Sequence, residues 1–489
     1  MMTIERKYFN LPLTILIIAF INSCSFEERS VINEKQIDYL VPHAISGENE
    51  SLFEHSSVYV NDYSNFLHGI FMIAGNSRSS EYGNENYRPE LYPEKMNQRA
   101  VEWLNLMKFM DTHFNDSGRF VNRYMINEAG LEPSDDLDLS IYPHLVYAYH
   151  MHHRGDRFND DVLFERLSRE TSNFIVKPGR FLISSLYDDG LFFHEDVTVD
   201  HKSMSYGLGG IHGHGYAWII WAKPEGEDNM GLLTEEALEI WLDYSIDEML
   251  DIYRAVAYQL NDNWFEEHSI YHFGDGDDWN LDAIGAMIRG KKVMYDFLYM
   301  FGDEDDFDTA VILFERTVKM FENVIDLIKP WGLPNRIKFT DNGAEPATDE
   351  VNLYHWYQFL NHIGGGYSFD REREGTSQFI NNRRPELKNR FSDLYDLALT
   401  GALEYHVNDE NRLYQSVSYE DGSVMDDLFT VSTAGMFITA AGNIYTNGSA
   451  FARADSWGSR SEEIVNSSRK LYDLKFNLIE TMELIIYGK

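Results

Sequence analysis

The sequence predicts a fold dominated by α-helices, in which helix pairs form a ring, an (α/α) toroid with few short strands. Helical periodicity dominates from about residue 94 onward, while strand-like alternation is sparse and short. Long loops bearing Gly, Asp, Asn and His join helical segments of similar length. A solenoid of stacked helix pairs would give the same pattern and stays open as an alternative.

The individual helices follow from apolar residues at spacings of three and four. Val101, Leu104 and Met107 show this spacing in the segment 97–110. The same criterion predicts helices at 141–151, 163–174, 235–260, 283–301, 308–328, 386–405 and 467–487. A short strand is expected at 413–419. No long linker divides the chain, so residues 91–489 are predicted to form one toroid catalytic domain, preceded by an N-terminal segment, 24–90, that is partly linker.

Residues 1–23 are predicted to be a lipoprotein signal peptide. Arg6 and Lys7 precede an apolar run from Leu11 to Ile21, which is too short for a bilayer, because a spanning helix needs about 20 residues. The run ends before Cys24, the only cysteine, in a pattern that resembles a bacterial lipobox. We therefore expect a bacterial cell-envelope protein, lipid-anchored at the outer membrane through Cys24, with no other membrane contact.

Composition narrows the classes of partner. The formal net charge is −39, which makes the chain a poor nucleic-acid binder, because phosphate contacts need clustered Lys and Arg. Aromatic residues reach 14%, and exposed Trp or Tyr faces suit the apolar face of a sugar ring. With a single cysteine, disulfides, Cys-ligated zinc sites and thiol nucleophiles are not expected in the mature chain. The sequence does not indicate an oligomeric state.

The segment 188–216, DDGLFFHEDVTVDHKSMSYGLGGIHGHGY, gathers four histidines, two tyrosines and six glycines. Asp189 and Gly190 predict a turn before an apolar pair and His194, and Tyr206 opens the glycine-rich part. Glycines allow the backbone to approach a ligand closely or to take positive φ. Histidine titrates near neutrality, so the segment indicates proton-transfer chemistry in a loop.

Two motifs resemble the hyaluronate and chondroitin AC-type polysaccharide lyases, or a related uronate oligosaccharide dehydratase. They are DG-x-F-x-x-H followed by S-Y-G, which in the resemblance opens a helix, and the downstream segment DWNLDAIGAMIR at 278–289; the resemblance covers roughly residues 90 to 300. It implies an (α/α) toroid that performs β-elimination, with Tyr206 as acid/base and His194 as its partner. Ile284 stands where the family has its first arginine.

Elimination from a uronic acid requires three devices. The carboxylate must be neutralised or hydrogen-bonded, a base must reach the C5 proton, and an acid must protonate the leaving oxygen at C4. A nearby cation could lower the pKa of a tyrosine enough for it to act as the base. We expect Asn280 and Arg289 to hold the carboxylate, and His212, His214 and Trp279 to contribute to substrate binding; Asn280 also suits a helix cap.

The leading expectation is thus a carbon–oxygen lyase acting on uronate-containing anionic glycans, such as ulvan or glycosaminoglycans. It would give a 4,5-unsaturated uronate either by chain cleavage or by dehydration of the non-reducing end.

Two alternatives stay open. A glycoside hydrolase acting on uronides could use carboxylates among Asp188, Asp189, Glu195 and Asp196. A noncatalytic glycan-binding lipoprotein is the other. No cofactor and no metal ligand set are expected, because residues 275–278 (DGDD) lack the spacing of a calcium loop.

Overall fold

The computed structural model describes part of the chain. These residues are 57–76, 106–108, 110–113, 115–116, 118–127, 130–133, 137–145, 176–196, 198–221, 239, 242–274, 276–366, 394, 397–398, 400–451, 470–471, 474 and 477–482. The predicted signal peptide, Cys24 and the predicted helix 163–174 lie outside them. Among the described helices none is long and apolar enough to cross a membrane.

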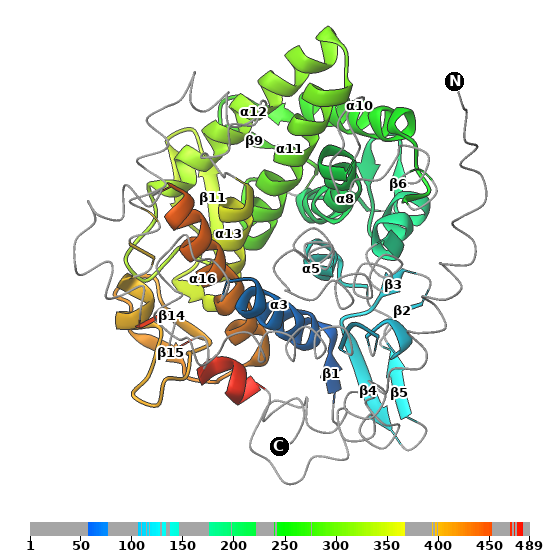
Figure 1. Ribbon diagram of the computed structural model, residues 1–489. Helices are drawn as coiled ribbons and strands as arrows, with labels where there is room; N and C mark the ends of the chain where they lie inside the picture. Colours follow the sequence, from blue (N-terminus) through cyan, green and yellow to red (C-terminus); the bar gives the residue numbers. More distant parts are fainter. Residues whose placement is uncertain are drawn as a thin grey trace, which may run out of the picture.

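In the described part of the chain, six helices pack side by side in a closed inner ring (Figure 1). Each packs on the next in chain order, and α3 closes the ring against both α16 and α5. The ring helices are α3 (Val60–Asn76), α5 (Tyr142–Leu145), α8 (His201–Trp221), α11 (Leu281–Phe301), α13 (Leu353–Gly366) and α16 (Val431–Phe451).

Outer helices alternate with the ring helices along the chain. α10 (Ile246–Asp262) and α12 (Glu304–Ile325) follow α8 and α11, and both pack on α11 from outside. This alternation of inner and outer helices confirms the predicted (α/α) toroid. The helices expected at 283–301 and 308–328 are α11 and α12. Within 97–110, 386–405 and 467–487, the described residues are helical, and within 235–260 helix α10 begins at Ile246.

Capping residues fix where the outer helices begin. Ser245 accepts a hydrogen bond from the Glu248 backbone N–H, and the Glu248 side chain accepts one from the Ser245 N–H. Asp303 and Asp306 form the same reciprocal box at the start of α12. Such boxes satisfy backbone donors that the first helical turn leaves without partners.

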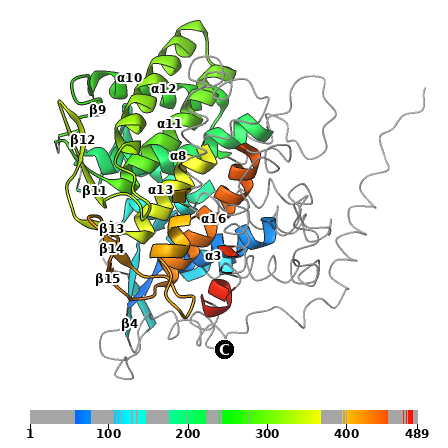
Figure 2. The same cartoon turned by 90° about the vertical axis from the view of Figure 1, so that its left-hand side faces the viewer.

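The strands are short, antiparallel and gathered at one end of the ring (Figure 2). The three-stranded sheets are β1–β4–β5, β10–β11–β12 and β13–β14–β15, and the two-stranded ones are β2–β3, β6–β7 and β8–β9. Their bounds are β1 Ser57–Tyr59, β2 Asn115–Asp116, β3 Arg119–Phe120, β4 Arg123–Asn127, β5 Gly130–Pro133, β6 Tyr187–Asp188, β7 Leu191–Phe192, β8 Trp264–Phe265, β9 Ile270–Tyr271, β10 Asp278–Asn280, β11 Arg336–Thr340, β12 Gly343–Pro346, β13 Glu350–Asn352, β14 Ser416–Ser418 and β15 Val424–Asp426. Since β1, β10 and β13 lead directly into α3, α11 and α13, this end carries the N-termini of those helices.

The glycines of the segment 188–216 predicted a loop, but most of the segment is helical. The predicted turn at Asp189 and Gly190 is confirmed, but residues 201–221 form the ring helix α8. Glycines in α8 serve close packing: a Cβ at Gly207 would lie 2.2 Å from Phe192 Cγ, and one at Gly215 2.2 Å from the Tyr253 hydroxyl.

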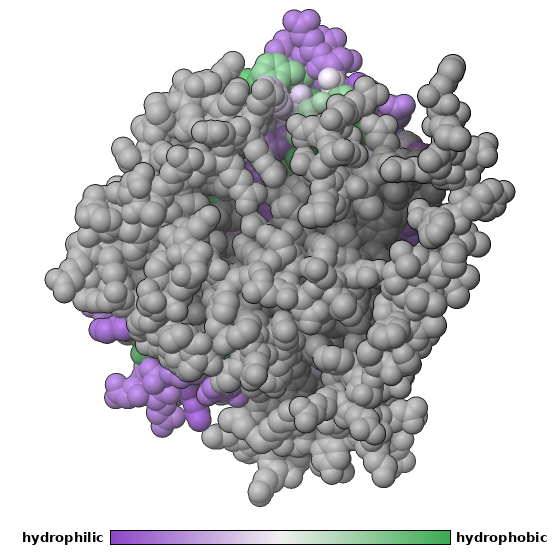
Figure 3. Space-filling view, in the orientation of Figure 1, coloured by the Kyte–Doolittle hydropathy of each residue, from purple (hydrophilic) through white to green (hydrophobic). Residues whose placement is uncertain are grey.

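The segment 24–90 contains a ring member, because α3 packs along α16. The ring thus includes residues 60–76, which precede the predicted start of the toroid at residue 91. On the face shown in Figure 3, most of the described residues that are visible at the lower left are hydrophilic.

Candidate active site

Contacts between early residues of neighbouring helices show that five ring helices run parallel. Ser432, near the start of α16, bonds Asp62 near the start of α3, and Tyr206 of α8 bonds Asp282 of α11. In α13, Tyr354 lies close enough to Asn65 of α3 for that amide to lower the pKa of the phenol. The N-terminal ends of α3, α8, α11, α13 and α16 therefore meet at the end of the ring that carries the strands.

Polar side chains from these ends converge at the middle of the ring. We call this set the ring-centre cluster; it consists of Asp62, Asn65, Asp138, Tyr206, Asp282 and Tyr354. Asp138 caps the short 3-10 helix η5 (Leu139–Ile141), which leads into α5. The cluster is thus built by α3, η5, α8, α11 and α13, and only a ring brings these elements to one point.

Tyr206 and Asp282 form the central pair of the cluster. The Tyr206 hydroxyl donates a hydrogen bond to Asp282 Oδ2, and the two residues are 5% and 3% exposed. Burial, and then the Asp282 charge, raise the pKa of Tyr206 well above its usual value, because both disfavour the phenolate. The phenol is therefore a neutral hydrogen-bond donor. This corrects the expectation of a nearby cation, since the group beside Tyr206 is a carboxylate.

The pair has one free acceptor. Within the described residues, the buried Asp282 Oδ1 has no hydrogen-bond partner. A buried carboxylate oxygen without a partner costs free energy and suits contact with a ligand. Asp138 is half-buried and accepts a hydrogen bond from Asn122 Nδ2 at 3.1 Å, so it forms an outer edge of the cluster.

Two further members show how acidic the surroundings are. Burial, followed by the charges of Asp138, Asp282 and Asp62, raises the pKa of Tyr354, although the nearby Asn65 side chain opposes the shift. Burial raises the pKa of Asp62 to about 6, despite hydrogen bonds from the Ser432 backbone and hydroxyl. The cluster thus holds two neutral phenols and a carboxyl group that retains its proton in weakly acidic solution.

His194 is not bonded to Tyr206. Its Nε2 atom lies 3.0 Å from Asp200 Oδ1, just before α8, and Asp200 also caps the helix by accepting from the Ser203 N–H at 2.7 Å. The bond with Asp200 raises the pKa of His194, and both residues are half-buried. The structure therefore joins the two predicted catalytic residues to different carboxylates, and their roles stay predictions.

The other predicted site residues divide by burial. Asn280 is half-buried and occupies the cap position of α11, without a side-chain cap hydrogen bond. Trp279 is 0% exposed, and its ring stacks on that of buried His201 with centroids 4.5 Å apart. A sugar cannot stack on a fully covered ring, so the expected substrate contact of Trp279 is corrected: it is a core residue.

Three more residues expected to bind substrate are also buried. Arg289 is 5%, His212 1% and His214 2% exposed. Burial lowers the pKa of Arg289 well below its usual value, and those of His212 and His214 to about 4 and about 3. Both histidines are therefore neutral at pH 7 and lie inside the helix layer. The expected roles of these three residues in substrate binding stay predictions.

The carboxylates considered for a hydrolase lie elsewhere. Asp188, Asp189, Glu195 and Asp196 are exposed, and Glu195 pairs with Arg119 through two hydrogen bonds of 2.6 and 2.9 Å. The buried carboxylates of the ring centre were missed. Asp282 belongs to the second motif, at 278–289, but in that motif Asn280 was predicted to bind substrate and Asp282 was not.

Comparison with known proteins finds no matching family model and no matching curated protein. Several solved structures are similar in shape. A sugar epimerase from a ruminal bacterium shares 11% identity, covering 85% of this chain and 98% of its own, with a TM-score of 0.46. Cellobiose 2-epimerase from Bacillus thermoamylovorans shares 10%, covering 89% and 99%, with a TM-score of 0.46. A GH105-family candidate from Salmonella enterica shares 7%, covering 85% and 93%, at 0.43. At these values the likenesses do not bear on reaction or substrate.

Proposed function

We propose that this protein is a glycan-acting acid–base enzyme that performs β-elimination at a uronic acid. The observation that carries the proposal is the hydrogen bond from the Tyr206 phenol to Asp282 at the centre of the ring. A phenol held by a carboxylate can pass a proton in either direction without leaving its place. The motif resemblance, which selects the same tyrosine, supports elimination as the reaction.

The proposed step keeps the proton count balanced. As the Tyr206 oxygen takes the C5 proton, its own proton moves to Asp282, and the electron pair of the C5–H bond forms the C4–C5 double bond. The C4–O bond breaks, and the proton returns from Asp282 through Tyr206 to the leaving oxygen. This relay never requires a free phenolate, which suits a tyrosine whose pKa is raised.

Charge stabilisation of the uronate is assigned to the ends of the ring helices. A helix N-terminus carries about half a positive charge, and its free N–H groups bind anions. The contact with Asp200 raises the pKa of His194 and so favours its protonated form beside the start of α8. In this proposal His194 binds the anionic substrate rather than taking the C5 proton.

Hydrolysis of an unsaturated uronide is a second candidate. The charges that bear most on Tyr206 are the carboxylates Asp282 and Asp138, and the Asp62 carboxyl keeps its proton up to about pH 6. A carboxylic acid in this place could protonate C4 of the double bond, and water would then add at C5. The released sugar would carry no conjugated double bond.

Ultraviolet absorbance of the conjugated double bond separates these reactions. We expect an increase when the protein is incubated with ulvan or glycosaminoglycan oligosaccharides, and mass spectrometry then tells chain cleavage from loss of water. A decrease with pre-formed unsaturated oligosaccharides would instead identify the hydrolase. Tyr206→Phe and Asp282→Asn should each abolish turnover while oligosaccharide binding remains. No change in absorbance, together with measurable binding, would favour the noncatalytic glycan-binding protein.

The cellular location is part of the proposal. Lipidation at Cys24 would hold the enzyme at the outer membrane, near polymeric glycans. Metabolic labelling with a fatty acid analogue in a bacterial host should mark the wild type and leave Cys24→Ser unmarked. Equal labelling of both proteins would contradict the anchor.

A further inference from the structure

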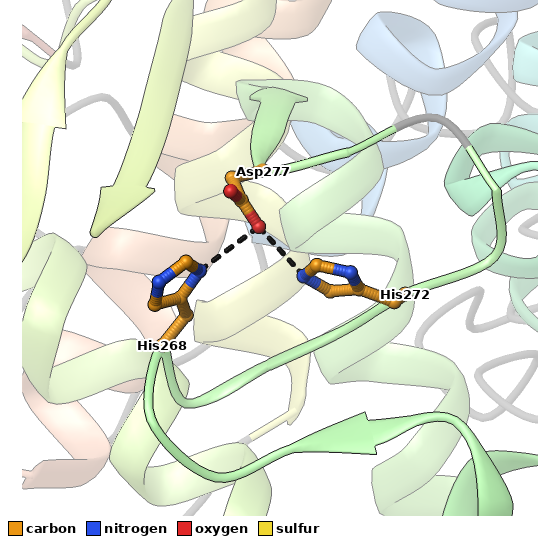
Figure 4. Close-up of side chains that lie close together, drawn as sticks. All are labelled: His268, His272 and Asp277. Atoms are coloured by element: carbon orange, nitrogen blue, oxygen red, sulfur yellow. Dashed lines mark hydrogen bonds and ion pairs between the residues drawn. The ribbon is translucent and has the colours of Figure 1, made fainter. Parts of the chain in front are cut away.

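The connection between α10 and α11 carries a second group of side chains, distinct from the ring-centre cluster. Strands β8 and β9 form a hairpin whose turn bears His268, and His272 directly follows β9. Asp277 directly precedes β10. Figure 4 shows the three side chains pointing toward one another.

The three groups converge on a small volume. His268 Nδ1 lies 3.0 Å from Asp277 Oδ1, and His272 Nε2 lies 2.6 Å from the same oxygen. One ligand atom from each residue lies within 4.8 Å of the other two. Within the described residues, this is the one group of three or more such side chains that could hold a metal ion.

The surroundings hold the ligands in place. The other ring nitrogen of His268, Nε2, lies 2.8 Å from Asp341 Oδ1, a carboxylate on the turn between β11 and β12. Metal-binding histidines commonly donate their second N–H to such a carboxylate, which fixes the tautomer and orients the ring. Phe265 packs on both histidines, with ring centroids at 4.5 and 4.8 Å.

We propose that His268, His272 and Asp277 bind a divalent first-row transition-metal ion, with zinc as the expected occupant. Two imidazole nitrogens and one carboxylate oxygen are ligands typical of zinc, whereas calcium and magnesium prefer oxygen ligands. The side chains of His272 and Asp277 are 36% and 27% exposed, so water can complete a tetrahedral site. A metal in the middle replaces the present contacts to the Asp277 oxygen.

The ion would act by positioning the segment that leads into α11. Asp277 is followed by β10, whose Trp279 stacks on His201, and by Asp282 in the first turn of α11. Tying the β8–β9 hairpin to Asp277 would restrain this segment, and Asp282 with it. The ion has no role in the proton relay, so the metal site stands or falls independently of the proposed reaction.

Metal binding can be measured directly on the untagged full-length chain. After treatment with a chelator and dialysis, titration with zinc chloride in a calorimeter should show one strong site. Elemental analysis after gel filtration should then find one zinc per chain. Cobalt, used as a spectroscopic substitute, should give the intense visible bands of a tetrahedral site with nitrogen and oxygen ligands.

Matched variants assign the site. His272→Gln and Asp277→Asn keep hydrogen-bonding groups of similar size but remove good ligands, so strong zinc binding should be lost. Asp341→Asn should weaken it about 10- to 100-fold, because it removes only the group that orients His268. His355→Ala alters a histidine outside the group and should leave binding unchanged. Circular dichroism of the metal-free variants checks that each still folds.

Two results would overturn the proposal. One is the absence of stoichiometric zinc binding to folded wild-type protein. The other is strong binding that survives unchanged in both His272→Gln and Asp277→Asn, since the ion would then be held elsewhere.

Discussion

Replacing Tyr206 by Phe tests the central pair through stability as well as activity. The change removes the hydroxyl that donates to Asp282 Oδ2 and leaves the ring in place. Oδ1 of Asp282 has no hydrogen-bond partner within the described residues even in the wild type. The variant therefore leaves both oxygens of this carboxylate, which is 3% exposed, without a hydrogen-bond donor from the described residues. Leaving such a buried acceptor unsatisfied costs about 1–3 kcal/mol, and more when it is charged.

Tyr253→Phe is the matched control. Tyr253 is 0% exposed, and its hydroxyl has no hydrogen-bond partner within the described residues. Removing that hydroxyl should leave the free energy of unfolding unchanged or slightly higher. Chemical unfolding of both variants should therefore show Tyr206→Phe less stable than Tyr253→Phe by about 2 kcal/mol.

Activity gives the second measurement. General acid–base catalysis contributes about 10²- to 10⁴-fold, so Tyr206→Phe should lose at least that factor in elimination rate while Tyr253→Phe keeps wild-type turnover. Equal stability of the two variants would refute the hydrogen bond to Asp282 as a stabilising contact. Retained elimination in Tyr206→Phe would refute the assignment of the phenol as proton carrier.

Three further outcomes follow from packing and burial. Gly207→Ala places a Cβ 2.2 Å from a neighbouring ring, so we expect a loss of about 1–3 kcal/mol in urea unfolding. Gly209→Ala meets nothing nearer than 3.2 Å and should be close to neutral, because alanine also favours the helix. The folded-state pKa values of His212 and His214, about 4 and about 3, lie below the usual 6.5, so the unfolded chain binds protons first. Their contribution to the free energy of unfolding is complete above pH 6.5 and falls as the pH drops toward 4. Replacing both histidines by Asn should therefore reduce the decrease in the free energy of unfolding between pH 7 and 5. The folded-state pKa of Asp62 is raised from 3.8 to about 6, so its contribution is complete below pH 3.8 and is lost as the pH rises through 6. The shift corresponds to about 3 kcal/mol at about 1.4 kcal/mol per unit, and Asp62→Asn should remove this pH dependence from unfolding curves measured between pH 4 and 7.

The outer helices were easier to predict than the ring helices, for a physical reason. α10 and α12 have one face on the ring and one in solvent, so their apolar residues recur at helical spacing. α8 is covered on most sides, and its five glycines permit close contact with neighbouring elements. Its sequence therefore lacks a polar face and contains residues that usually end helices, which is why the segment was interpreted as a loop, with a helix expected only from the S-Y-G motif onward.

The candidate site was predictable only in part, because its partners are distant in the chain. Tyr206 stands in a recognisable motif, but its hydrogen-bond partner Asp282 lies 76 residues further on. In the motif that contains Asp282, the residue predicted to bind substrate was Asn280, which occupies the cap position of α11. Asp62 lies in a segment without a helical prediction, so nothing in the pattern placed it near Tyr206. Closure of the ring creates these contacts, and closure is not encoded in local periodicity.

In the proposed reaction, the parallel ring helices would allow an acidic ring centre to accept an anionic sugar. Asp62 and Asp282 stand in the first turns of α3 and α11, where the positive helix end favours a carboxylate by about 0.3–1 kcal/mol, and more when buried. The first turns of α8, α13 and α16 contain no acidic residue. Asp200 caps the start of α8, however, and Asp62 accepts a hydrogen bond from the Ser432 N–H of α16, so carboxyl groups already occupy two of these helix ends. In the proposed reaction the resident carboxylates would handle protons, and the start of α13 would be the position for the uronate carboxylate.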